Sequence, residues 1–242
     1  MLQKQFFILR LITILMLISL NSCKKNNNAG VSPPPPVTDR DGNVYKTVRI
    51  GNQVWMAEPL RVTQYNDGTP IPYIKKGSDW SKDTSGARCY YGTNEASTDR
   101  SNADSAKYSV PYGGLYNFAA VHSGKLAPIG YHVPDTNDFR ILTNYLGDPS
   151  IAGQFLKSVS YWNDDMDSSY STRNSTKFSA LPAGYRGFNG YFDKLGHQSY
   201  LWSSTEVGSF AFCQSLANNN TAFNRTFNNK LFGLTVVCIR NY

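Results

Sequence analysis

Glycine recurs through the last third of the chain and interrupts its apolar runs. After Phe178 it stands at positions 184, 187, 190, 196, 208 and 233, with only short apolar stretches between them. Glycine is unfavourable inside helices and marks turns, bulges and loops. This region therefore favours short strands joined by loops.

The composition narrows the class of protein further. The chain has 242 residues, which suits one large domain or two small ones, and it contains 4 Trp, 16 Tyr and 13 Phe. So many aromatic rings can bury a core, which argues against a disordered chain. The Ala, Glu, Lys and Leu bias of coiled coils is missing. A single strongly apolar run excludes a polytopic membrane protein.

The first 23 residues have the pattern of an export signal. Lys4 and Arg10 give a basic start, and residues 11–20 form an apolar stretch. This stretch would rise about 15 Å as a helix, which is too short to span a bilayer. A signal peptide therefore fits better than a membrane anchor.

The apolar stretch ends in Leu20-Asn21-Ser22-Cys23, which resembles the lipobox of bacterial lipoproteins. The resemblance implies cleavage before Cys23 and lipidation of its thiol, and several acyl chains would hold the protein on a membrane. We expect a signal peptide over residues 1–22 and a location in the cell envelope, at the outer membrane. The alternative is an ordinary cleaved signal followed by an incidental cysteine.

Residues 23–37 are expected to be the lipidated cysteine and a proline-rich tether. Polar residues and the prolines at 33–36 cannot build a core and favour a short polyproline II rod. No acidic cluster follows Cys23, so the surface and periplasmic faces of the membrane both stay open. Residues 38–242 contain no second linker and are expected to form one domain.

Basic residues outnumber acidic ones without forming a patch. Removal of Lys4 and Arg10 with the signal lowers the formal net charge from +7 to about +5. The other Lys and Arg residues are scattered along the chain. This distribution argues against nucleic-acid binding by an exported protein.

Strand patterns stand at both ends of the domain, and helical patterns lie between them. Alternation predicts a strand over 44–50, and the hairpin turn Gly51-Asn52 predicts a returning strand over 53–56. A closing strand is expected over 234–240. Residues 61–110 read as a loop-rich insertion. The predicted helices cover residues 115–121, residues 151–157, and a segment that begins at the N-cap Asp135, has Asp138 at N3 and ends at Gly147.

Seven segments of the chain match motifs of a known family. They are residues 41–45, 50–58, 114–117, 127–134, 178–186, 202–205 and 237–240. In this order they resemble the Fibrobacter succinogenes major paralogous domain, a family of exported bacterial proteins, over about residues 38–242. Pro59, Asp138 and Phe139 depart from the family pattern.

The resemblance implies an α+β, C-type lectin-like fold, which also underlies the formylglycine-generating enzymes. It implies two or three short helices, a mixed and mainly antiparallel sheet, long loops, and termini that lie close together. The family brings no established activity and no shared catalytic residues.

Three cysteines remain beyond Cys23, and export permits a disulfide. The family motifs retain Cys89 and Cys238, so the resemblance favours a bond between these two, with Cys213 left as a buried free thiol. The alternatives are three reduced cysteines, or a copper site of Cys213 and Cys238 as in the formylglycine-generating relatives.

Other chemical motifs are weak. Trp162-Asn163-Asp164 is superficially like the Trp-Asn-Asp of calcium-dependent lectins, but it lies far upstream of Cys213, so a solvated loop is preferred. The histidines stand singly, at His122, His132 and His197. Without metal-site spacing or a Gly-x-Ser-x-Gly elbow, we expect no metal and no cofactor, and the sequence favours a protein without catalysis over an enzyme. Arg186 and Arg240 are expected to pair with buried carboxylates or carbonyls.

A late polar run is the candidate ligand site. It falls between two predicted strands, where lectin-like folds commonly carry binding loops, and comprises Asn218, Asn219, Asn220 and Asn224. Amides donate and accept hydrogen bonds, and rings such as Phe223 or Trp202 can stack on sugars. The alternative is a plain solvent-exposed hairpin loop.

The leading hypothesis is a cell-envelope lipoprotein with one lectin-like domain that binds a glycan or a protein. One rival is a structural or assembly subunit of a surface structure. The other is an enzyme distantly related to the formylglycine-generating group. In each case four rings are expected in the core: Trp55, Tyr116, Phe139 and Trp202.

Overall fold

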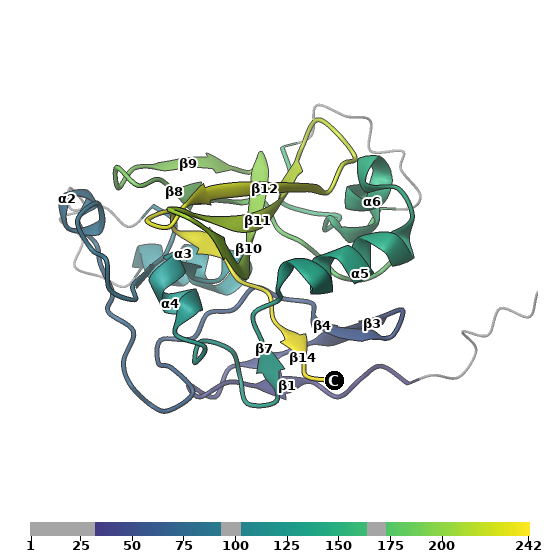
Figure 1. The fold of residues 1–242 in the computed structure, drawn as a ribbon, viewed down its shortest axis with the longest axis horizontal. Helices are drawn as coiled ribbons and strands as arrows, with labels where there is room; N and C mark the ends of the chain where they lie inside the picture. Colours follow the sequence, from purple (N-terminus) through teal and green to yellow (C-terminus); the bar gives the residue numbers. More distant parts are fainter. Residues whose placement is uncertain (1–31, 93–102, 164–172) are drawn as a thin grey trace, which may run out of the picture. The chain divides into compact units, whose positions relative to one another are not determined.

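The computed structural model describes residues 32–92, 103–163 and 173–242 (Figure 1). The expected signal peptide, the lipobox and Cys23 lie outside these residues. From Pro33 onward the described chain forms one compact unit. No helix in the described ranges is both long and apolar enough to cross a membrane.

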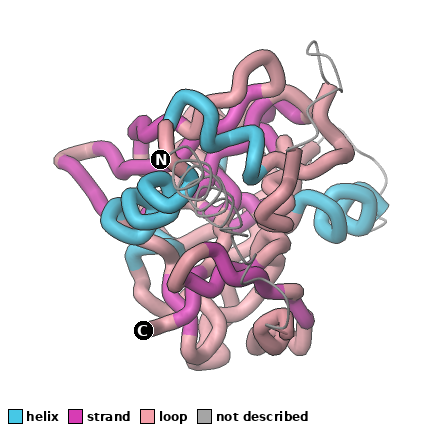
Figure 2. The backbone as a smooth tube through the Cα atoms, turned by 90° about the vertical axis from the view of Figure 1, so that its right-hand side faces the viewer, coloured by secondary structure: helices cyan, strands magenta, loops and turns pink. Residues whose placement is uncertain are grey.

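The helices are short and loops fill much of the backbone path (Figure 2). The helices are α2 (Gly77–Trp80), α3 (Ala103–Tyr112), α4 (Phe118–His122), α5 (Thr136–Leu146) and α6 (Pro149–Leu156). The longer strands are β3 (Thr47–Ile50), β4 (Gln53–Met56), β8 (Ala183–Arg186), β9 (Phe192–Leu195), β10 (Gln198–Val207), β11 (Phe210–Ala217) and β12 (Asn224–Asn229). The two-residue strands are β1 (Val37–Thr38), β2 (Val44–Tyr45), β5 (Arg88–Cys89), β6 (Leu115–Tyr116), β7 (Tyr131–His132), β13 (Leu234–Thr235) and β14 (Ile239–Arg240).

The described strands form three sheets. The largest has the order β12-β11-β10-β13-β6-β5, with β8 also on β10 and β9 on β8, and a four-stranded sheet has the order β3-β4-β14-β7. The third pairs β1 with β2. Only β13 and β8 run parallel to their neighbour β10 among the named strand pairs. Few helices with mixed, mainly antiparallel sheets confirm the α+β class.

The prediction of one closing strand over residues 234–240 is wrong. β13 pairs with β10 and β6 in the large sheet, whereas β14 pairs with β4 and β7 in the other sheet. The intervening residues 236–238 are all buried, because the chain passes through the core from one sheet to the next. An apolar run buried on all sides has no period that would reveal the break.

Helix α5 follows the prediction closely. The Asp135 carboxylate accepts a hydrogen bond from Asp138 N at 2.8 Å, and Asp138 Oδ2 accepts one from Asp135 N at 2.9 Å. Asp138 therefore completes the capping box despite its shorter side chain. Gly147 ends the helix at φ +100°.

The predicted helix over 115–121 is correct only in part. Residues 115–116 form β6, and α4 begins after Asn117, whose side chain accepts from Ala120 N. The same amide oxygen also accepts from Ala87 N at 2.9 Å, which fixes the start of the helix against the insertion. That insertion contains α2, β5 and all but the last two residues of α3.

The four rings expected in the core are all buried. The exposed fraction is 0% for Trp55, Tyr116 and Trp202 and 1% for Phe139. Trp55 packs against Phe139 with ring centroids 5.5 Å apart, which joins the four-stranded sheet to α5. Aromatic pairs at this spacing add stability beyond the area that they bury.

Candidate functional site

The asparagine run does not form a fully exposed loop. Asn218 is only 7% exposed, and its Nδ2 donates to the main-chain oxygen of Asn163 and contacts His197 Nδ1 at 3.2 Å. The buried Lys157 donates to the carbonyl oxygens of Ala217 and Asn220 and so holds the loop from beneath. Of the four predicted asparagines, Asn219 and Asn224 are the exposed ones.

The two rings suggested as stacking partners are also unavailable. Trp202 packs edge-on against Phe118 at 5.5 Å, and its indole N–H donates to Tyr116 O at 2.8 Å. Phe223 is 2% exposed and packs against Phe139. Both rings support the core, and the expectation that they meet a ligand is wrong.

Strand register places a different set of side chains beside Asn224. Tyr200 lies opposite Ser215, and Ser215 lies opposite Asn224. Directly opposed residues share one face of a sheet, so these three form a row across β10, β11 and β12. Tyr185 on β8 extends the row, because its ring meets Tyr200 at 5.6 Å. We call Tyr185, Tyr200, Ser215 and Asn224 the tyrosine face.

Two phenylalanines continue the tyrosine face beyond β8. The Phe232 ring lies 5.4 Å from Tyr185, and the Phe188 ring lies 5.9 Å from Phe232. Phe188 is 54% exposed, on the turn that joins β8 to β9. The face therefore presents a connected series of four rings that ends in solvent.

Among the described residues, the sheet surface that carries the tyrosine face is more exposed at one end than at the other. Trp202 lies two residues beyond Tyr200 on the same face, where Phe118 of α4 covers it. Tyr200, Tyr185 and Ser215 are half-buried, and Asn224 is exposed. The more exposed end thus combines parts of the tyrosine rings with hydroxyl and amide groups.

The phenols of the tyrosine face are fixed donors. Tyr200 Oη donates to Gln198 Oε1 at 2.7 Å, and Tyr185 Oη donates to Asp193 Oδ2 at 3.3 Å. Burial raises the pKa of both phenols above their usual value of 10. Both hydroxyls therefore stay protonated at neutral pH, and each ring is held in place by its own hydrogen bond.

Comparison with known families identifies the chain. The sequence profile of the Fibrobacter succinogenes major domain matches residues 48–240. The chain belongs to the Fibrobacter succinogenes major domain family. The match includes every strand of the tyrosine face. No curated protein and no solved structure matched the chain.

The three cysteines in the described part of the chain are free thiols. Cys89, Cys213 and Cys238 are all buried, and the bond predicted between Cys89 and Cys238 is not formed. Cys89 packs in a small cluster with Trp80, whereas Cys238 lies in the main core. Burial raises the pKa of Cys89 to about 11 and that of Cys213 to about 12, so both stay protonated at neutral pH.

The arrangement of strands also separates the two cysteines of the suggested copper site. Cys213 lies on β11, between β10 and β12. Cys238 lies between β13 and β14, where its carbonyl oxygen accepts from Met56 N. The two cysteines are therefore not on adjacent strands, and burial raises the pKa of Cys238 as well.

The first two residues of the Trp-Asn-Asp motif, Trp162 and Asn163, have a structural role. Trp162 is 8% exposed, Asn163 N donates to Gly196 O, and Asp164 lies outside the described residues. No group of three or more His, Cys, Asp or Glu side chains within the described ranges could hold a metal ion.

His132 is engaged at both ring nitrogens. Nε2 meets Asp138 Oδ2 at 3.0 Å, and Nδ1 meets Asn241 Oδ1 at 2.8 Å. Asp138 Oδ1 accepts from Tyr242 Oη at 2.7 Å. The hydrogen bond to Asp138 raises the pKa of His132. This network fastens the C-terminal residues to the start of α5, so its evident role is structural.

Sequence patterns contained only part of the signal for the tyrosine face. Tyr185 falls inside a family motif, at residues 178–186, and Asn224 was already a candidate. Tyr200 sits two residues from the motif at 202–205. What brings the three together is the pairing register of β8, β10, β11 and β12, which single-sequence alternation does not specify.

Proposed function

We propose that this chain is a cell-envelope lipoprotein whose domain, over residues 38–242, binds a glycan through the tyrosine face. The observation that carries the proposal is the row of Tyr185, Tyr200, Ser215 and Asn224 across four strands. We also propose that the domain has a C-type lectin-like fold. The pairing of β14 with β4, which brings the end of the domain back to its beginning, supports that architecture.

A sugar is the ligand whose chemistry matches this surface. A pyranose ring has an apolar C–H face and a polar rim of hydroxyl groups. Aromatic faces accommodate the first, and amide and hydroxyl groups bond the second. Tyr200 and Tyr185 offer rings, while Asn224 and Ser215 offer donors and acceptors within the same row.

Binding fits the described chemistry better than catalysis does. The three buried thiols have raised pKa values, so none is a ready nucleophile. His132, which a general-base role would need free, is held by Asp138 and Asn241.

The tyrosine face predicts a specific loss of binding. With the full chain in detergent on a glycan array, Tyr200→Ala and Asn224→Ser should each weaken the strongest glycan signal by about tenfold, or about 1.4 kcal/mol. Tyr191→Ala is the matched control, because Tyr191 is 76% exposed on the turn beside β9 and lies outside the row. EDTA should leave binding unchanged.

Equal affinity of wild type and Tyr200→Ala would remove the tyrosine face from the site. If no glycan binds at all, the proposal fails and the rival structural-subunit hypothesis gains weight. Measurement of native size in detergent would then test that hypothesis.

The proposed lipid anchor predicts that replacing Cys23 removes the protein from the membrane. Cys23→Ala should abolish labelling with palmitate and release the protein from the membrane fraction, because acylation of Cys23 supplies the anchor. Cys213→Ala is the control and should keep both label and location, since Cys213 is a buried thiol of the domain. Continued labelling of Cys23→Ala would contradict the lipobox assignment.

A further inference from the structure

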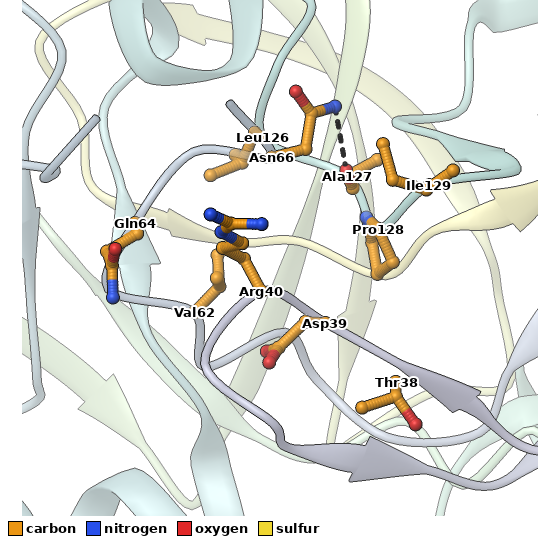
Figure 3. Close-up of a pocket in the computed structure, with 10 residues that line it drawn as sticks. All are labelled: Thr38, Asp39, Arg40, Val62, Gln64, Asn66, Leu126, Ala127, Pro128 and Ile129. Carbon is orange, nitrogen blue, oxygen red and sulfur yellow. Dashed lines mark hydrogen bonds between the residues drawn. The ribbon is translucent and has the colours of Figure 1, made fainter. Parts of the chain in front are cut away.

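A second site lies away from the tyrosine face and shares no residue with it. A pocket of about 260 Å³ opens between the turn after β1, the loop at 62–66 and the connection from α4 to β7 (Figure 3). This volume falls just below the usual range of drug-sized sites, roughly 300–1,000 Å³. The pocket therefore suits a small ligand or one unit of a longer one.

The floor of the pocket is apolar and its centre is cationic. Val62 and Leu126 are each 2% exposed, and Ala127 is 4% exposed. The Arg40 guanidinium stands among these lining residues, between Gln64 and Ala127 (Figure 3). It lies over Gly68, where an added Cβ would be 3.4 Å from its Nη2.

The N–H donors of the Arg40 guanidinium are not used by any described residue. Within residues 32–92, 103–163 and 173–242, no hydrogen bond or ion pair is made by Arg40. The nearby Asp39 carboxylate is already satisfied, because Oδ1 accepts from Asp41 N and Asn43 N, and Oδ2 accepts from Asn43 Nδ2 and Tyr45 Oη. The guanidinium therefore faces the pocket with its planar set of N–H groups unused.

Two amide oxygens complete the polar lining. Asn66 Nδ2 donates to Ala127 O at 3.2 Å, and Gln64 Nε2 donates to Asp41 Oδ1 at 3.1 Å. Each bond uses the amide nitrogen and fixes the side chain. Neither amide oxygen accepts a hydrogen bond from a described residue, so both can accept one from a ligand hydroxyl or N–H.

We propose that this pocket binds a small carboxylate, with the acid group on Arg40 and a neighbouring hydroxyl or N–H on Asn66 and Gln64. A guanidinium matches a carboxylate in a paired, planar geometry that also discriminates against neutral groups. The apolar floor takes the carbon body of the ligand. Two sources carry this chemistry: the acid sugar of a glycan, and the acyl amino acid at the end of a peptide.

The probes are D-glucuronate and N-acetyl-L-alanine, with D-glucose and N-acetyl-L-alaninamide as their neutral counterparts. Binding to the full chain in detergent is measured by calorimetry. At least one acid should bind, its neutral counterpart should bind at least tenfold more weakly, and added salt should lower the affinity. The acid that binds identifies the source.

Arg40→Gln should lower the affinity for the acid that binds at least tenfold. It should not lower the melting temperature, since Arg40 is exposed. The affinity of Arg40→Lys should lie between those of wild type and Arg40→Gln, because a lysine keeps the charge but lacks the planar set of N–H donors. Arg49→Gln, at the exposed position of β3, changes the net charge equally and should bind like wild type. The proposal is overturned if neither acid binds, if the neutral counterparts bind as well as the acids, or if Arg40→Gln and Arg49→Gln behave alike. None of these outcomes bears on the tyrosine face.

Discussion

Trp202→Ala is expected to lower the free energy of unfolding by about 3–5 kcal/mol, the usual cost of deleting a fully buried large ring. The indole is 0% exposed, packs on Phe118 and donates to Tyr116 O. The substitution leaves a cavity between β10 and α4 and removes the hydrogen bond from the indole to Tyr116 O. Such a loss is a large part of the total stability of an ordinary domain, about 5–15 kcal/mol.

Denaturant unfolding measures this cost, with Tyr191→Ala as the reference. Tyr191 is 76% exposed, so its truncation should change stability by no more than about 0.5 kcal/mol. A Trp202→Ala protein with the wild-type midpoint would mean that Trp202 is not in the core. It would then return as a stacking candidate for a ligand.

The parts of the fold that the sequence predicts well are those whose signals are local. In α5, the N-cap Asp135, Asp138 at N3 and the terminal Gly147 all lie within one short segment, and the structure has each in its expected role. The hairpin of β3 and β4 is likewise specified locally, by alternation in the first strand and by the turn at Gly51-Asn52. Only the break between Tyr45 and Thr47 differs from the predicted strand.

The errors come from contacts between distant segments. Asn218 looks exposed in a run of asparagines, yet Asn163 and His197, from another part of the chain, bury its amide. The run at 234–240 looks like one strand, yet each end pairs in a different sheet. Neither partner is adjacent in sequence, so composition and periodicity carry no record of the contact.

For the same reason, the sequence alone does not predict either of the two proposed sites. The tyrosine face depends on register between strands, and the Arg40 pocket depends on three loops that meet. The family motifs at 41–45 and 127–134 border that pocket, which was the available clue. Motif positions alone do not say whether a polar turn supports the backbone or faces a ligand.

For Arg186 the sequence predicts the kind of partner, a buried carboxylate or carbonyl, but not which residues supply it. The guanidinium is 1% exposed and donates to three carbonyl oxygens, Gly190 at 3.0 Å, Ile74 at 2.6 Å and Lys75 at 2.7 Å. It lies 4.6 Å from the Trp80 ring centroid and 4.9 Å from that of Phe192. One side chain thus joins the turn after β8 to the segment that leads into α2.

Arg186→Met should therefore lower the free energy of unfolding by about 2–4 kcal/mol. Methionine fills similar volume but leaves three carbonyls without a donor, and hydrogen bonds to a charged group contribute about 1.5–3 kcal/mol each. The desolvation of a buried guanidinium offsets part of that sum, since removing the charge also removes its burial cost.

Two further variants separate the hydrogen bonds from the charge. Arg186→Lys keeps the charge, but an ammonium lacks the planar fork and the stacking on Trp80, so about half of the loss should remain. Arg49→Met removes an exposed arginine and should change stability by no more than about 0.5 kcal/mol. If Arg186→Lys proves as stable as wild type, charge alone would account for the effect. If Arg186→Met is also as stable, the three carbonyls must find other donors, and this arginine would not be what joins β8 to α2.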